Sequence, residues 1–155
     1  MAMSSLWARI EPLLARVQKP ARYIGCEDGA ITPRYGTGKV SWLLAYPDTY
    51  EIGLPNQGLQ ILYDILNDRD DAVAERTYAP WNDLEALMRE RGVPLFSVDT
   101  HRAAGDFDLL AELPHRRALA HHHVLPVDAR AQGPVLGFEV ALPQRVAHDE
   151  DGLLQ

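Results

Sequence analysis

VSWLLAY, the stretch Val40–Tyr46, is a short and almost continuous apolar run that ends at Pro47-Asp48. Valine, tryptophan and tyrosine favour strands, and a strand that is apolar on both faces is typical of a parallel sheet covered on both sides. We therefore expect a buried strand over residues 40–46, in a central position of a parallel sheet.

Downstream of this strand, a loop over residues 49–56 leads into apolar residues at helical spacing. Ile61 and Ile65 widen the apolar face, so we expect a well-buried helix. The residues that set the spacing are Leu59, Leu62, Tyr63 and Leu66.

Strand and helix patterns then alternate. Ala72–Tyr78 predicts a second strand, and its Glu75 and Arg76 indicate that it lies near an edge of the sheet or ends early. Asn82 and Glu85 are spaced as in a capping box, which predicts the start of a helix that Gly92 ends. We expect a third strand over Leu95–Val98 and the start of a fourth at Phe107–Leu110.

The first forty residues are less regular. Apolar residues recur at helical spacing before Gln18, but Pro12 interrupts them. Because proline is tolerated in the first turn of a helix, we expect this helix to begin near Glu11. Prolines and glycines over residues 20–39 predict an extended, loop-rich connection.

Strands alternating with helices at short intervals indicate an α/β fold, a Rossmann-like parallel sheet with flanking helices. We expect three parts: a lead-in over residues 1–39, the Rossmann-like domain over 40–110, and an irregular tail over 111–155. After Leu110, prolines and histidines accumulate and no strand or helical period persists. The tail is therefore expected to be out of frame or divergent, leaving the sheet incomplete.

Composition excludes several classes of protein. The net charge of −7 disfavours binding to nucleic acid or to an anionic membrane. No apolar stretch approaches the length of a membrane span, and no signal peptide is evident. The chain has one cysteine, Cys26, which cannot form an intrachain disulfide, so we expect a cytoplasmic protein.

Two groups of residues suggest metal chemistry and are better explained without it. His115 and His121–His123 crowd together, but adjacent histidines point in different directions, so a solvated tail is favoured over a metal site. Asp99 and His101 are spaced as in the D-x-H-x-x-G signature of cobalamin proteins, yet the glycine comes one residue late. We predict no metal ligands.

Two further motifs also carry no chemistry. Gly36–Lys39 lacks the spacing of a phosphate-binding loop and precedes the strand instead of following it. Cys26 is followed by Glu27 and Asp28, and adjacent acids disfavour the thiolate. We assign no catalytic residue.

The loop after the first strand is the most informative stretch. It carries tyrosines, acids, a proline and a glycine directly after a buried strand, where parallel sheets bind ligands. A tight strand-to-helix turn explains the same residues equally well, so both interpretations stay open. The candidate cofactor-binding residues are Asp48, Tyr50, Glu51, Asn56 and Gln57.

Several motifs resemble, in the same order, the N-terminal part of a family of largely uncharacterised bacterial radical SAM proteins. The similarity runs from about Leu6 to about Leu110. The motifs are WARIEPLL (Trp7–Leu14), KPARYIG (Lys19–Gly25), AYPDTYEIGL (Ala45–Leu54), GLQILY (Gly58–Tyr63), YAPW (Tyr78–Trp81) and LFS (Leu95–Ser97).

The resemblance implies a cobalamin-binding-like domain placed before a radical SAM barrel. Cobalamin is then a possible cofactor of this chain, whereas the iron–sulfur cluster and S-adenosylmethionine are implied only for the full-length family. The cluster needs three cysteines in a C-x-x-x-C-x-x-C motif, and this chain has one. We expect the isolated chain to bind no iron.

Two functions follow as hypotheses. In the first, the chain is a truncated cobalamin-binding-like domain that is non-catalytic alone and positions a cofactor or substrate over the missing barrel, its expected partner. In the second, it is a protein-interaction or structural domain with no small-molecule ligand. The sequence leaves the oligomeric state open.

Overall fold

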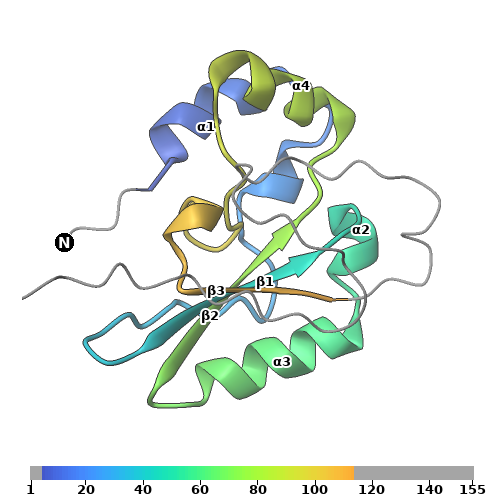
Figure 1. Ribbon diagram of the computed structural model, residues 1–155. Coiled ribbons are helices and arrows are strands. Elements are labelled where there is room, and N and C mark those ends of the chain that lie inside the picture. Colours follow the sequence, from blue (N-terminus) through green and yellow to red (C-terminus); the bar gives the residue numbers. More distant parts are fainter. Residues whose placement is uncertain (1–4, 114–155) are drawn as a thin grey trace, which may run out of the picture.

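A parallel sheet flanked by helices forms the centre of the molecule in the computed structural model, which describes residues 5–113 (Figure 1). Its strands are β1 (Val40–Tyr46), β2 (Ala72–Tyr78) and β3 (Leu109–Glu112). They lie in the order β2-β1-β3, and β1 pairs in parallel with both neighbours. The predicted α/β fold and the central position of Val40–Tyr46 are confirmed.

The apolar character of β1 explains its place. Leu43 and Leu44 are buried and Trp42 is half-buried, so both faces of the strand are covered. Fully burying a leucine stabilises a fold by about 1.5–3 kcal/mol. An edge position would forfeit part of that stabilisation.

Helix α3 (Gln57–Asn67) lies along one face of the sheet (Figure 1). The side chain of Asn56 caps it by accepting a hydrogen bond from the backbone N–H of Leu59 at 3.0 Å. Leu59 and Tyr63 are buried against the sheet, but Ile61 is 57% exposed and Ile65 is 54% exposed. The prediction that these isoleucines widen the buried face is wrong. Each isoleucine comes two positions after a buried residue, which places it on the opposite side of the helix, away from the sheet.

Helices α1 (Trp7–Leu14) and α4 (Asn82–Arg91) pack together on the other side of the sheet (Figure 1). Helix α1 begins at Trp7 and contains Pro12, so the predicted start near Glu11 is wrong. An interior proline costs about 3 kcal/mol. The burial of Ile10, Leu13 and Leu14 offsets that cost, since each contributes about 1.5–3 kcal/mol.

The predicted capping box at the start of α4 is also wrong. Trp81 is the capping residue, and no side chain caps the helix. Asp83 is used differently: its Oδ2 accepts a hydrogen bond from the backbone N–H of Gln18 at 2.9 Å, which ties α4 to the segment after α1. The predicted end at Gly92 is confirmed, with Gly92 in the left-handed conformation (φ 61°).

Leu95–Val98 is not a strand of the sheet, contrary to prediction. Phe96 forms only an isolated bridge with Ala103, while the N–H of Val98 donates to the carbonyl of Arg76 at 2.9 Å. The next hydrogen bond along the β2 edge uses a side chain, since Asp99 Oδ2 accepts from the backbone N–H of Arg76 at 2.7 Å. A carboxylate thus replaces the carbonyl that would have continued the pairing.

Three short helices complete the described residues: η1 (Pro20–Tyr23), α2 (Tyr50–Gly53) and η2 (Ala104–Asp106). Helix α2 lies inside the predicted loop over residues 49–56. Strand β3 begins at Leu109, two residues later than expected, and the tail predicted to be divergent lies outside the described residues beyond Leu113. No helix between residues 5 and 113 combines the length and apolar character needed to cross a membrane.

Candidate functional site

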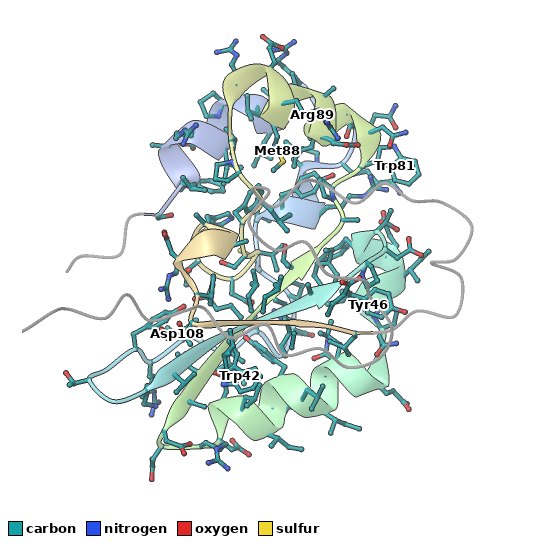
Figure 2. All side chains as sticks on the ribbon, viewed as in Figure 1. Trp42, Tyr46, Trp81, Met88, Arg89 and Asp108 are labelled. Carbon is teal, nitrogen blue, oxygen red and sulfur yellow. The ribbon has the colours of Figure 1, made fainter. Side chains whose placement is uncertain are left out.

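The carboxyl ends of β1 and β2 lie at one edge of the sheet, where parallel sheets bind their ligands. Helix α2 follows β1 there, and Ala79, Pro80 and Trp81 follow β2. Tyr46 and Trp81 lie on this side of the molecule (Figure 2). The backbone joins the two segments, because the N–H of Ala79 donates to the carbonyl of Asp48 at 2.9 Å.

Glu51 is engaged by cations of the lead-in segment. Its Oε1 lies 2.7 Å from Arg22 Nη2 and 3.2 Å from Lys19 Nζ. Burial acts to raise the pKa of Glu51, but the hydrogen bonds from Arg22 and Lys19 and the charge of Arg22 together lower it. The Arg22 guanidinium also lies over the Trp81 ring, 4.9 Å from its centre. Glu51 therefore holds η1, α2 and the start of α4 together.

The other polar candidates mostly build the turn. Asn56 caps α3, and Asp48 Oδ1 accepts from the N–H of Thr49 at 2.7 Å. Gln57 is exposed in the first turn of α3. The structure thus brings Asp48, Glu51 and Asn56 into one folded turn, as expected for a strand-to-helix connection.

Tyr50 is the candidate that points toward the interior. Its ring meets the Tyr78 ring edge-on, with 5.5 Å between the centres. Burial, followed by the nearby charge of Glu27, raises the pKa of Tyr50 to about 12. Gly53 leaves room for these rings, since a Cβ there would lie 2.6 Å from a ring carbon of Tyr78.

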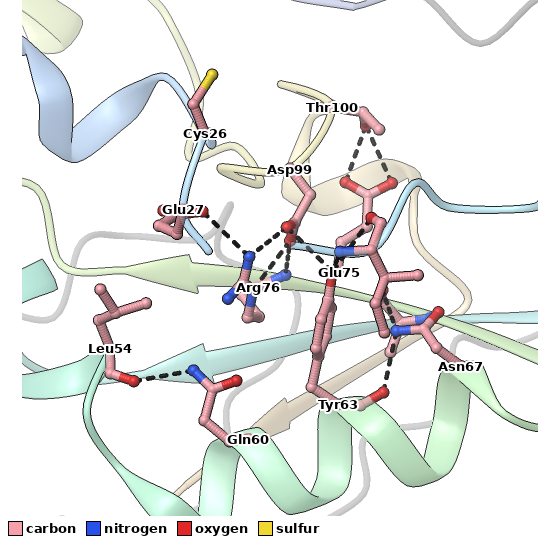
Figure 3. Close-up of polar contacts among 12 residues, drawn as sticks. Cys26, Glu27, Leu54, Gln60, Tyr63, Asn67, Glu75, Arg76, Asp99 and Thr100 are labelled. Atoms are coloured by element: carbon pink, nitrogen blue, oxygen red, sulfur yellow. Dashed lines mark hydrogen bonds and ion pairs between the residues drawn. The ribbon is translucent and has the colours of Figure 1, made fainter. Parts of the chain in front are cut away.

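Next to these tyrosines lies a buried ionic cluster that sequence reasoning missed. We call Arg76, Asp99, Glu27 and Tyr63 the Arg76 cluster (Figure 3). The Arg76 side chain is 1% exposed, and its Nη2 lies 2.6 Å from Asp99 Oδ1 and 3.3 Å from Glu27 Oε2. The guanidinium lies over the Tyr63 ring, 4.3 Å from its centre. One cation therefore serves two buried carboxylates.

Burial and the short distances between these charges shift the pKa values of Asp99 and Arg76. Burial raises the pKa of Asp99, and the hydrogen bonds from Arg76 act in the opposite direction. Burial acts to lower the pKa of Arg76, but the hydrogen bond and charge of Asp99, with Tyr78 and Tyr63, together raise it. Arg76 stays charged and holds Asp99 in place.

A third buried carboxylate belongs to Glu75, the residue before Arg76. Its Oε1 accepts a hydrogen bond from the Tyr35 hydroxyl. Thr100 Oγ1 lies within hydrogen-bond distance of both carboxylate oxygens, 3.0 Å from Oε1 and 2.8 Å from Oε2. The backbone N–H of Ile31 donates to the Tyr63 hydroxyl at 3.0 Å. Glu27 and Tyr35 thus fasten the loop between η1 and β1 to β2, and Ile31 fastens it to α3.

The chemistry available at this edge is limited. Between residues 5 and 113, no group of three or more His, Cys, Asp or Glu side chains is placed to hold a metal ion. The cavity beneath Tyr50 and Tyr78 has a volume of about 10 Å³, enough for roughly one water molecule. Two buried oxygens have no partner in the described part of the chain, namely Glu27 Oε1 and the Tyr78 hydroxyl. The polar side chains at this edge mostly bond to one another and leave little free space for a ligand.

His101 is also engaged within the fold. Its Nε2 lies 2.7 Å from the carbonyl oxygen of Tyr23, and its ring packs between Trp7 and Phe96. Asp99, two residues earlier, bonds to Arg76 and not to His101. Asp99 and His101 therefore each have a partner within the fold.

The buried tyrosines predict an alkaline limit to stability. The pKa values of Tyr50 and Tyr63 are raised from 10.0 to about 12, by burial first and by Glu27 and Asp99 second. A raised tyrosine pKa favours folding fully below the unfolded value, and this contribution is lost as pH rises through the folded value. Between pH 10 and 12 we expect circular dichroism and tyrosinate absorbance to change together.

A Tyr50→Phe variant provides the comparison, since it removes one ionising group and should keep its helical signal to higher pH. Ionisation of all the tyrosines near pH 10 with the fold intact would contradict this prediction.

One feature of the sequence does point to the Arg76 cluster. Glu75 and Arg76 are charged residues inside the strand pattern of Ala72–Tyr78, and they indicated an edge strand, which is confirmed. They did not end the strand early, because partners distant in sequence satisfy them when buried. Buried charge in a strand was the available sign of a polar cluster.

Comparison with known families gives a match over part of the chain. No curated protein and no solved structure matches it significantly. The matched region of the family comparison runs from α3 through β3 and thus includes β2, Arg76 and Asp99. Residues 58–113 match the family described as the N-terminal region of radical SAM proteins, which supports the resemblance to radical SAM proteins seen in the sequence.

Proposed function

We propose that this chain supplies the N-terminal domain of a radical SAM protein and performs no chemistry itself. The observation that carries the proposal is the match of residues 58–113 to the N-terminal region of such proteins. In the whole protein the domain positions a cofactor or substrate relative to the radical SAM barrel. The chain's single cysteine means that the cluster is held elsewhere, and its reduced, exposed thiol suits the cytoplasm.

Cobalamin does not fit the cavity at the carboxyl edge of the sheet. A corrin ring needs a wide surface or cleft, whereas the cavity under Tyr50 and Tyr78 has a volume of about 10 Å³. His101, the only histidine between residues 5 and 113, is buried and bonded to Tyr23. We therefore favour a domain that acts through its fold and surface over one that holds cobalamin at this edge.

A second candidate function rests on the unpartnered oxygens of Glu27 and Tyr78. Buried polar atoms without partners cost about 1–3 kcal/mol each and often mark a ligand or water site. A small hydrogen-bonding group that entered the cavity beside Tyr50 could satisfy the Tyr78 hydroxyl, which lines it. This alternative predicts that a polar ligand raises the melting temperature.

Cobalamin binding provides the direct test. The full chain is incubated with excess hydroxocobalamin, passed through a desalting column and examined by visible absorption. We expect no retained cobalamin, because the described edge is filled by the chain's own side chains. A cobalamin-binding protein treated in parallel serves as the positive control.

The same preparation, reconstituted anaerobically with iron and sulfide, is expected to hold no stoichiometric cluster. Retention of cobalamin would contradict the proposal that the chain's own side chains fill this edge. A stoichiometric cluster would contradict the proposal that the chain performs no chemistry itself.

A further inference from the structure

The carboxyl edge also carries an exposed apolar patch. Large exposed apolar side chains between residues 5 and 113 are few, and three of them belong to segments at this edge: Ile24 at 37%, Ile52 at 46% and Trp81 at 42% exposure. Ile24 follows η1, Ile52 lies in α2, and Trp81 precedes α4. We call these three residues the edge patch. Grouped apolar exposure of this kind marks binding surfaces.

The Arg22–Glu51 ion pair links two members of the edge patch, Ile52 and Trp81. Arg22 bonds to Glu51, which precedes Ile52, and covers one face of the Trp81 ring. Arg22 and Glu51 offset each other, and Lys19 adds one positive charge beside Glu51. An apolar centre with tryptophan and arginine is the composition of energetically important interface sites.

The edge patch is also held rigidly before any partner binds. The backbone N–H of Trp81 donates to the Tyr23 hydroxyl at 3.1 Å, and Ala79 is bonded to Asp48. Gly25, the residue after Ile24, packs against the backbone of Val98. A surface that is already ordered loses less entropy on binding.

The direction of β3 indicates what binds there. Strand β3 is parallel to β1, and the N–H of Leu113 donates to the carbonyl of Ala45 at 2.9 Å. The chain therefore leaves the described domain at the same edge that carries the edge patch. In a protein of which this is the N-terminal domain, the radical SAM domain is connected from this edge.

We infer that the edge patch of Ile24, Ile52 and Trp81 is the surface on which the domain docks onto the radical SAM domain of its protein. This inference rests on the proposed function and specifies it: the domain is positioned by its carboxyl edge and not by α3. The exposed Ile61 and Ile65 of α3 lie on the far side of that helix from the sheet and lack a comparable aromatic anchor.

The test titrates the full chain with the cluster-loaded radical SAM domain of the same protein, produced as a separate polypeptide. Ile52→Asp and Trp81→Ala should each weaken the association by about tenfold or more, since both remove part of an apolar interface centre. Ile61→Asp is the matched control and should change the affinity by less than about twofold. Alkylation of the exposed Cys26, two residues after Ile24, should slow on binding.

The outcomes separate the two proposals. Thermal melts establish that each variant is folded, and Ile52 is exposed enough that its substitution should not unfold the chain. Unchanged affinity in Ile52→Asp, with a loss in Ile61→Asp, overturns docking through the edge patch but leaves the proposed function standing. No association of the wild-type chain also overturns docking, whereas a cluster bound by the chain itself overturns the proposed function.

Discussion

Replacing Arg76 by alanine is expected to lower the free energy of unfolding by about 3–5 kcal/mol, the usual cost of leaving buried carboxylates without their cation. Asp99 would lose the partner 2.6 Å away, and Glu27 would lose its only cation in the cluster. The loss is a large fraction of the roughly 5–15 kcal/mol that stabilises a domain. Urea unfolding followed by circular dichroism measures it.

Arg69→Ala is the matched control, since Arg69 forms an equally short ion pair with Asp71 but both side chains are exposed. Exposed pairs contribute little, so the urea midpoint should hardly move. Similar small effects of both substitutions would show that the Arg76 cluster does not stabilise the fold. A double variant with Asp99→Asn should recover part of the loss, because it removes one stranded charge.

Gly25→Ala is expected to cost about 3 kcal/mol or more, from two sources that add. Gly25 has φ 67°, a conformation that strains any residue with a Cβ. A Cβ there would also overlap the carbonyl oxygen of Val98 and lie 2.9 Å from its carbonyl carbon. Relief of that overlap would separate the lead-in loop from the segment that carries Asp99. The same urea titration measures the change.

Gly29→Ala separates the two sources. Gly29 also has a positive φ, 83°, but nothing lies within 4 Å of its added Cβ. It should show only the backbone cost, about 1 kcal/mol. Equal effects at Gly25 and Gly29 would mean that the close approach to Val98 is not important for stability.

The parts of the fold that were predictable are those governed by local pattern. The apolar run of Val40–Tyr46 predicted a central parallel strand because burial on both faces demands it. Gly92 predicted the end of α4 for an equally local reason, its left-handed conformation. Ala72–Tyr78 was predictable as a strand near an edge, since its charges suit that position.

The incorrect predictions depend on tertiary contacts. Leu95–Val98 has strand-like residues, yet the Asp99 carboxylate takes the place of a backbone acceptor and ends the pairing. Pro12 argued against an interior helical position, but packing of α1 against α4 outweighs it. To predict either feature, one would have to know which residues far along the chain contact it.

The candidate site was predictable in place but not in composition. The loop after β1 does lie at the carboxyl edge, with Tyr50 and Glu51 among its residues. Its partners were not visible, because Arg22 reaches Glu51 across 29 residues and Asp99 reaches Arg76 across 23. Ion pairs at such separations leave no periodic trace in a sequence.

The fastening of the lead-in loop at Glu27, Ile31 and Tyr35 has a kinetic consequence. These contacts span 49, 32 and 40 residues, so we expect them to form late, after α3 and β2 have paired with β1. Interactions that form after the transition state chiefly slow unfolding and leave the folding rate little changed. We therefore expect the contacts of this loop to slow unfolding, and so to lengthen the lifetime of the native state, with little effect on the folding rate.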